Sequence, residues 1–150
     1  MEIYNREAKF NYFILEEYEC GIVLKGTELK SIRLGRANIK DSYATIRNNE
    51  IYLLNMHISA YKEGNIFNHE ERRTRKLLMH KREIVKINNQ VMQEGLTLIP
   101  LKVYFKKNKV KILLGLCKGK KLYDKRQDIA KKDAERRMQK ALRANEKGNF

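Results

Sequence analysis

Six cations and no acid occupy residues 72–82, the sharpest basic cluster of the chain. Two of these cations, Lys81 and Arg82, fall in the first turn of a predicted helix, where positive side chains oppose the helix dipole by roughly a few tenths of a kcal/mol. A phosphate would compensate this cost, because helix-end amides and cations together attract anions. A solvated charged loop is the alternative. We favour phosphate binding.

A second basic run, residues 118–126, combines five cations with one aromatic ring. Gly119 permits a ligand to approach the backbone closely, and Tyr123 offers a ring on which a nucleobase can stack. A polar linker would have a similar composition. Because the ring lies within a basic run, we favour contact with nucleic acid.

One acidic patch interrupts this basic character: Glu16, Glu17 and Glu19 flank Tyr18. The patch could be a solvent-facing strand end. It could also accept hydrogen bonds from a base amino group or a ribose 2′-hydroxyl, which would provide specificity. The residues alone leave both interpretations open.

Catalytic and metal chemistry find little support in the residue pattern. The three histidines are dispersed, no recognised hydrolase or nucleotide-binding motif occurs, and Cys20 and Cys117 stand far apart with no C-x-x-C partner. The dispersed aspartates could form a nuclease site, but they are more simply explained as surface charges of helices and loops. We therefore expect a protein that is not an enzyme, with no cofactor, no metal and two buried free thiols.

The overall charge indicates a polyanionic partner. The chain has 150 residues, with 33 Lys and Arg against 18 Asp and Glu, a net charge of +15. Charge alone leaves DNA, RNA, acidic substrates and membrane surfaces open. No run approaches the roughly 20 apolar residues that cross a bilayer, and the amino terminus has no apolar signal core, which predicts a cytoplasmic location.

The elements that must position these residues are mainly strands. β-rich runs occur at residues 10–17, 21–24, 42–47, 51–55, 96–105 and 109–117. Alternation is clearest in the last run, where Val110, Ile112, Leu114 and Leu116 share one face. Tight turns are expected at Asn48-Asn49 and at residues 106–109.

Two predicted helices accompany the strands. A short one, residues 28–34, would be capped by Thr27 and end at Gly35, and a longer one, residues 80–94, would end at Gly95. The pattern predicts an α+β, mainly β fold: a small antiparallel sheet closed into a barrel, with the longer helix at one end.

The carboxy-terminal segment has a different character. Residues 118–150 contain 12 basic and five acidic residues, and few large apolar ones. Residues 124–143 have high helix propensity, with expected ion pairs from Asp128 to Lys132 and from Asp133 to Arg137. The apolar stripe is thin, so we expect this segment to be disordered until a partner supplies contacts.

An ordered set of short motifs connects these features. The motifs are Asn5-Arg6, Tyr12-Phe13-Ile14, Glu19-x-Gly21, GTELKS at 26–31, Asp41-Ser42-Tyr43, RKLL at 75–78 and GKKLYDKR at 119–126. In this order, over nearly the whole chain, they resemble the small protein B family, the bacterial proteins that bind transfer-messenger RNA (SsrA RNA).

The resemblance implies a fold and a set of partners. It implies an oligonucleotide-binding-type barrel with flanking helices, residues 1–122, and a flexible basic tail, residues 123–150, disordered when free and helical on the ribosome. The barrel would bind the tRNA-like domain of transfer-messenger RNA and deliver it to stalled ribosomes with elongation factor Tu. The tail would occupy the empty mRNA channel, against small-subunit rRNA near the decoding centre, during trans-translation. Neither DNA nor a membrane is implied.

Site residues follow from the matched positions and from the basic clusters. Glu19 matches the family's RNA-contacting acid, Asn5 and Leu78 match other RNA-binding positions, and Tyr123 replaces a histidine of some members. The residues expected to bind transfer-messenger RNA are Asn5, Arg6, Glu19, Arg75, Lys76, Leu78, Lys81, Arg82 and Lys118. The residues expected in the decoding region and mRNA channel are Gly119, Lys120, Lys121, Tyr123, Asp124, Lys125, Arg126, Lys131, Lys132, Arg136 and Arg137. A ribosomal or general structured-RNA-binding protein is the alternative.

Overall fold

The computed structural model describes residues 2–63 and 68–148, with side chains up to residue 144. The chain divides into two compact units, a body ending at Gly119 and a tail beginning at Lys120. This division falls three residues before the boundary expected from the sequence. The expected tail extends to residue 150, and its last two residues lie outside the described part.

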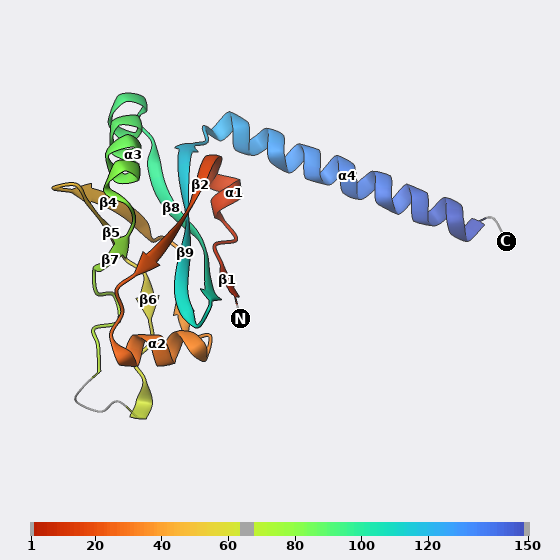
Figure 1. Cartoon of the computed structure of the whole chain (residues 1–150). Helices are drawn as coiled ribbons and strands as arrows, with labels where there is room; N and C mark the ends of the chain where they lie inside the picture. Colours follow the sequence, from red (N-terminus) through yellow and green to blue (C-terminus); the bar gives the residue numbers. More distant parts are fainter. Residues whose placement is uncertain (1, 64–67, 149–150) are drawn as a thin grey trace. The chain divides into compact units, whose positions relative to one another are not determined.

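The body contains nine strands and three helices, and the tail contains one helix, among the described residues (Figure 1). In chain order the elements are β1 (Glu2–Tyr4), α1 (Ala8–Asn11), β2 (Tyr12–Ile22), α2 (Gly26–Arg33), β3 (Ala37–Asn38), β4 (Tyr43–Arg47), β5 (Glu50–Leu54), β6 (His57–Ile58), β7 (Arg75–Leu78), α3 (Lys81–Glu94), β8 (Thr97–Lys106), β9 (Lys109–Gly119) and α4 (Leu122–Gly148).

Six antiparallel strands close into the barrel that the sequence predicted. Each strand pairs with the next in the order β8, β4, β5, β7, β2 and β9, and β9 pairs again with β8. The short strand β1 adds to the outer side of this ring by pairing with β8. Closure leaves few unpaired strand edges. Helices α2 and α3 lie at opposite ends of the strands (Figure 1).

Two apolar clusters hold the body together. The larger contains the alternating residues Ile112, Leu114 and Leu116 of β9, which are buried as the sequence predicted, and Ile84 and Ile87 of α3. The smaller cluster consists of Ala8, Ile99 and Cys117, with Tyr12, Ile14 and Leu101 packed against it. Both cysteines are buried free thiols, as expected.

The turns between strands have the backbone geometry that their residues favour. Asn48 and Asn49 have φ of 51° and 60°, and Lys107 and Asn108 have φ of 50° and 62°. Two successive positive φ values are typical of the two-residue turn whose twist matches antiparallel strands. Gly95 ends α3 with φ of 64°, confirming the predicted helix end.

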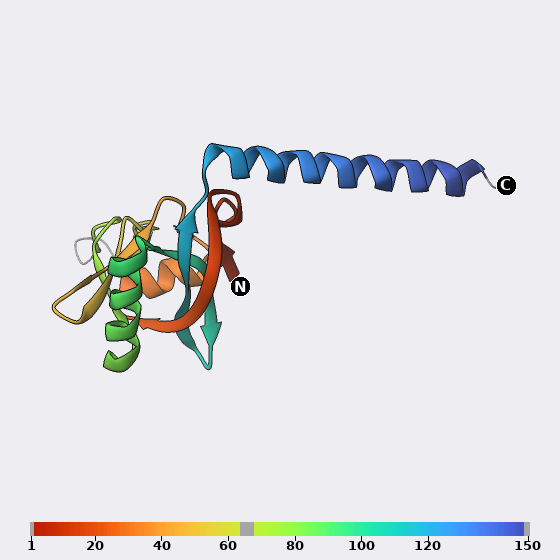
Figure 2. The ribbon, with the colours of Figure 1, turned by 90° about the horizontal axis from the view of Figure 1, so that it is seen from above.

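The amino-terminal strand prediction was partly wrong. Residues 10 and 11 belong to α1. The remainder of the run at 10–17 and the first two residues of the run at 21–24 form the single strand β2, and residues 23 and 24 lie outside it. A β-bulge between Ile14 and Glu16 shifts the register of β2 against β9, a feature that composition alone does not predict. Figure 2 shows β2 curving along its length. Four short strands, β1, β3, β6 and β7, were missed because two to four residues show little periodicity.

The start of the first predicted helix also needs correction. Helix α2 begins at Gly26, and the Lys25 backbone N–H donates to the Glu28 carboxylate at 2.8 Å. Thr27 therefore lies inside the helix and does not cap it. Its hydroxyl is 2.9 Å from His69 Nδ1, so it joins α2 to the segment before β7.

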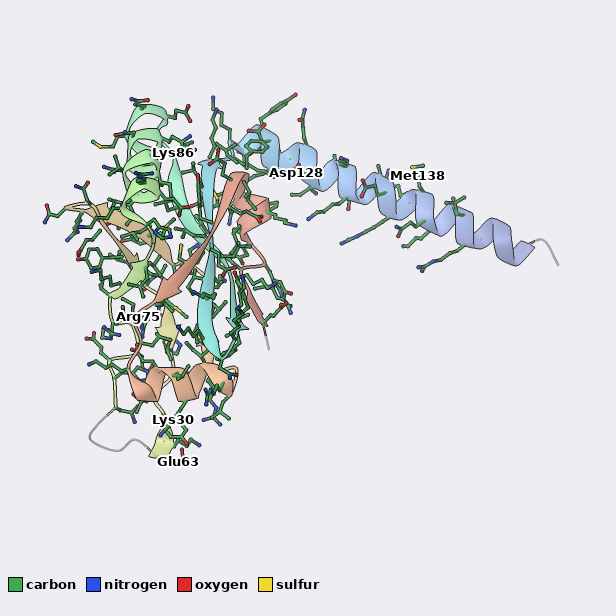
Figure 3. All side chains as sticks on the ribbon, viewed as in Figure 1. Lys30, Glu63, Arg75, Lys86, Asp128 and Met138 are labelled. Carbon is green, nitrogen blue, oxygen red and sulfur yellow. The ribbon has the colours of Figure 1, made fainter. Side chains whose placement is uncertain are left out.

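The tail is described as one helix, α4, with exposed side chains along residues 131–144 (Figure 3). Asp128 pairs with Lys120 instead of the predicted Lys132, and Asp133 makes no ion pair with another residue whose side chain is described. Disorder of the free tail stays a prediction. Within residues 2–63 and 68–148, no helix has the length and apolarity that crossing a membrane requires.

Candidate nucleic-acid interface

The structure places Glu19 on the outer face of the barrel among cations and one tyrosine. Lys106 Nζ lies 3.3 Å from a Glu19 carboxylate oxygen, and the Tyr104 hydroxyl hydrogen-bonds to the same carboxylate. This hydrogen bond, together with Lys106 and Lys111, lowers the pKa of Glu19 below its ordinary value. Burial and the nearby Glu19 raise the pKa of Tyr104 to about 12. At neutral pH Glu19 is therefore an ionised acceptor, and its side chain remains 38% exposed.

Leu78 lies on the same outer face, on a surface formed by the three neighbouring strands β7, β2 and β9. Leu78 pairs with Gly21 of β2, and Gly21 pairs with Lys111 of β9. A Cβ at Gly21 would be 3.2 Å from the Leu78 Cβ, so the glycine lets the leucine side chain lie across β2. Leu78 is 52% exposed. The predicted residues Glu19 and Leu78 thus lie on one surface. This surface presents an apolar side chain and a carboxylate, with cations around them.

Three residues of this surface were missed by the sequence analysis: Tyr104, Lys106 and Lys111. Their positions could have been found from alternation, because Lys111 lies between Val110 and Ile112 in the sequence and so points to the opposite face of β9. The turn at residues 106–109 then brings Lys106 and Tyr104 beside it. What the sequence lacked was the pairing of β2 with β9, which connects them to Glu19.

Asn5 and Arg6 lie elsewhere on the outer face, where the chain leaves β1. The Asn5 side-chain amide donates to the Pro100 carbonyl at 3.0 Å, and its backbone N–H donates to the Leu101 carbonyl at 2.9 Å. Asn5 is half-buried and is joined to β8 by these two hydrogen bonds, whereas Arg6 is exposed. Lys118 is exposed near the end of β9, paired with Phe13 of β2.

The basic cluster at residues 72–82 divides between the interior and the surface. Arg75 has no exposed side-chain area: its guanidinium contacts the buried Glu28 carboxylate and donates to the Met56 carbonyl at 2.7 Å (Figure 3). Arg73 binds the same carboxylate at 2.6 Å. Arg75 therefore stabilises the fold in place of the RNA contact expected from sequence.

The remaining cations of the cluster stay near the surface. Lys76 pairs with Glu50 at 3.1 Å and is 42% exposed. Lys81 and Arg82 are exposed in the first turn of α3, and neither forms an ion pair with another described residue. The N-cap residue His80 makes no side-chain capping bond. Amide donors and two available cations meet at this helix end, as phosphate binding requires.

In the tail, the expected residues lie on or just before α4. The Asp124 carboxylate accepts a hydrogen bond from the Lys121 backbone N–H at 3.2 Å, which supports the helix start. Tyr123 is 68% exposed, and its hydroxyl accepts from the Gln127 amide at 2.7 Å. The exposed cations Lys131, Lys132, Arg136 and Arg137 make no ion pair within the described tail. The helix is thus a cationic surface with an aromatic ring near its start.

Comparison with known proteins gives a consistent result. A family model described as SmpB protein matches residues 2–144. The SsrA-binding protein of Carboxydothermus hydrogenoformans is 63% identical over 140 residues, covering 93% of this chain and 94% of that protein. The SsrA-binding protein of Bacillus subtilis is 54% identical over 144 residues, covering 96% and 92%. A solved chain described as "tmRNA-SmpB: a journey to the center of the bacterial ribosome" has a TM-score of 0.68 and 48% identity, covering 81% of this chain and 85% of its own.

Proposed function

This chain belongs to the SmpB family of SsrA-binding proteins, and from that membership we propose how its two units act in trans-translation. The protein binds transfer-messenger RNA and acts with it on the ribosome. The observation that carries this conclusion is the extent of the family match, which covers the barrel and nearly all of α4.

We propose that the barrel binds the tRNA-like domain of transfer-messenger RNA. Glu19 and Leu78 contact the RNA directly, with Lys106 and Lys111 beside them. Arg6, Lys76, Lys81, Arg82 and Lys118 supply phosphate contacts. Asn5 also contacts the RNA, and its hydrogen bond to the Pro100 carbonyl fixes its side chain. Phosphate contacts position an RNA, whereas a carboxylate such as Glu19 selects hydrogen-bond donors.

The tail is proposed to occupy the empty mRNA channel of a stalled ribosome. Its exposed cations suit a tunnel lined by rRNA, and the exposed ring of Tyr123 can stack on a base near the decoding centre. Elongation factor Tu is the proposed partner in delivery, and the cytoplasm is the proposed location. The protein would act without catalysis, so RNA should remain intact after long incubation with Mg²⁺.

A truncation after Gly119 tests this division. The shortened chain is expected to retain most of its affinity for the tRNA-like domain and to lose peptide tagging on stalled ribosomes. Tagging by the truncated chain would contradict the tail's role. Competition by bulk tRNA at equal strength would instead favour a general structured-RNA-binding protein.

A further inference from the structure

A pocket of about 420 Å³ opens on the outer face of β1, β2, β8 and β9, next to the Glu19 surface. Its floor is apolar, formed by Ile14, Leu101 and Leu113. Its rim is polar and aromatic. The rim residues are Tyr4, Asn5, Arg6, Lys9, Glu17 and Lys102, with Ala8 beside them.

Two β-bulges build the floor of this pocket. One lies in β2 between Ile14 and Glu16, and the other in β8 between Pro100 and Lys102. Both face β9, which lies between them. Leu101 is the extra residue of the second bulge, and it lies directly over Gly115, where an added Cβ would be 2.9 Å from Leu101 Cδ1. Bulges commonly redirect side chains near functional sites. Here they place Leu101 in the floor.

Glu17 differs from the other two acids of its patch. Glu16 accepts a hydrogen bond from Tyr18, and Glu19 is bound by Tyr104 and Lys106. Glu17 is exposed at the pocket rim and has no ion pair or hydrogen bond to another described side chain. The pocket therefore presents a carboxylate that is free to accept hydrogen bonds from a ligand that carries donors.

Opposite Glu17 the rim offers an aromatic surface and positive charge. Tyr4 is 57% exposed. Lys102 Nζ lies 5.6 Å from the Tyr4 ring centre and 5.1 Å from that of Tyr104, and it pairs with Glu2 at 2.9 Å. The exposed Arg6 stands on the same rim. An apolar floor, an aromatic wall, cations and one acceptor suit a single planar base with a phosphate beside it.

We infer that this pocket binds one unstacked guanine base of a structured RNA, an inference that rests on the proposed function. Guanine carries the N1–H and N2–H donors side by side, which match the two oxygens of the Glu17 carboxylate. Adenine and cytosine offer only an amino group on that edge, and uracil only one N–H. The base lies against Leu101 and Leu113, and Arg6 contacts the adjoining phosphate.

The test measures base preference with the full chain and fluorescein-labelled heptamers UUUGUUU and UUUAUUU. By fluorescence anisotropy, the wild type is expected to bind the guanine heptamer about tenfold more tightly. Glu17→Gln keeps the size of the side chain but replaces one acceptor with a donor, and should bring the two heptamers within about twofold. Glu16→Gln, the same charge change one residue away, should keep the preference. Gly115→Ala should weaken binding of the guanine heptamer, because the added methyl group displaces Leu101.

Two further arms identify the source of the base and separate this inference from the proposed function. If Glu17→Gln weakens binding of the tRNA-like domain, the guanine belongs to transfer-messenger RNA. If it weakens binding of small ribosomal subunits, the guanine belongs to rRNA. A wild type that binds the tRNA-like domain but shows no guanine preference, or a Glu17→Gln variant that keeps the preference, would overturn the pocket assignment alone. Failure to bind the tRNA-like domain would overturn the proposed function.

Discussion

At the scale of single residues, carboxylates determine which cations of this basic protein face outward. Glu28, which has no exposed area, binds Arg73 and Arg75 and turns two members of the 72–82 cluster toward the interior. Glu19 has the opposite role, because it stays exposed while Tyr104 and Lys106 orient it. The same side-chain type thus anchors the fold at one position and presents an acceptor at another.

Glu19→Gln should weaken binding of the tRNA-like domain about tenfold, although it makes the protein more positive. The charged acceptor is lost, and a hydrogen bond to a charged group contributes about 1.5–3 kcal/mol. Equilibrium titration with the RNA provides the measurement. Glu16→Gln adds the same charge, so equal losses in both variants would argue against specific recognition by Glu19.

Glu28→Gln should destabilise the body by about 3–5 kcal/mol, because it leaves two guanidinium groups without their buried partner. The free energy of unfolding in urea provides the measurement. Glu50→Gln removes the partner of Lys76 in an exposed pair and should have a much smaller effect. Similar losses in both variants would mean that burial of the Glu28 pair is unimportant.

Glu28→Gln should also change how the free energy of unfolding depends on pH. Burial alone would raise the pKa of Glu28, but hydrogen bonds from Arg73, the Lys25 backbone and Arg75 lower it below its ordinary value. Such a group contributes stability above the unfolded-state pKa of about 4.3, and this contribution disappears as pH falls through the lower folded-state pKa. Wild-type stability should therefore fall below about pH 4, more steeply than that of Glu28→Gln.

At the scale of elements, α4 differs from the barrel because its described side chains build no core of their own. Its larger apolar residues, including Ile129, Met138 and Leu142, are exposed, so little holds the helix beyond local propensity. A helix of this kind responds strongly to propensity changes. The barrel strands, by contrast, are fixed by pairing on both sides.

Ala130→Gly combined with Ala134→Gly should cost the helix about 2 kcal/mol. We expect unchanged affinity for the tRNA-like domain and reduced tagging on stalled ribosomes. The control replaces the same two residues with Gln, which keeps helix propensity. Tagging that is equally reduced by Gln would show that side-chain size at these positions matters more than helix formation.

The sequence predicted the elements with long periodic patterns and missed those defined by pairing. The alternation of β9, the turn at Asn48-Asn49 and the end of α3 at Gly95 were all confirmed. The bulge after Ile14 and the short strand β7 depend on partners far along the chain, which local patterns do not contain. For the same reason the sequence could not show that Arg75 meets Glu28 in the interior.

At the scale of the whole molecule, the two units differ in what stabilises them. All members of both apolar clusters lie before residue 120. The body is thus a barrel with a complete core, and the tail adds net charge of +6, from 11 basic and five acidic residues in 120–150.

Removal of residues 120–150 should leave the thermal midpoint of the body within about 2 °C of the full chain, since surface changes rarely alter stability by more than about 0.5 kcal/mol. Thermal unfolding followed by the strand signal in circular dichroism provides the measurement. A large drop in the midpoint would mean that the tail contributes to the core.

The two buried thiols have a practical consequence for observing the tail. Burial raises the pKa of Cys20 to about 12 and that of Cys117 to about 11, and only the thiolate reacts readily with maleimides. Neither native cysteine should be modified near pH 7. A cysteine introduced at an exposed position of α4, such as Gln139→Cys, would then take a fluorophore selectively. Energy transfer from that dye could follow the tail into a stalled ribosome in real time.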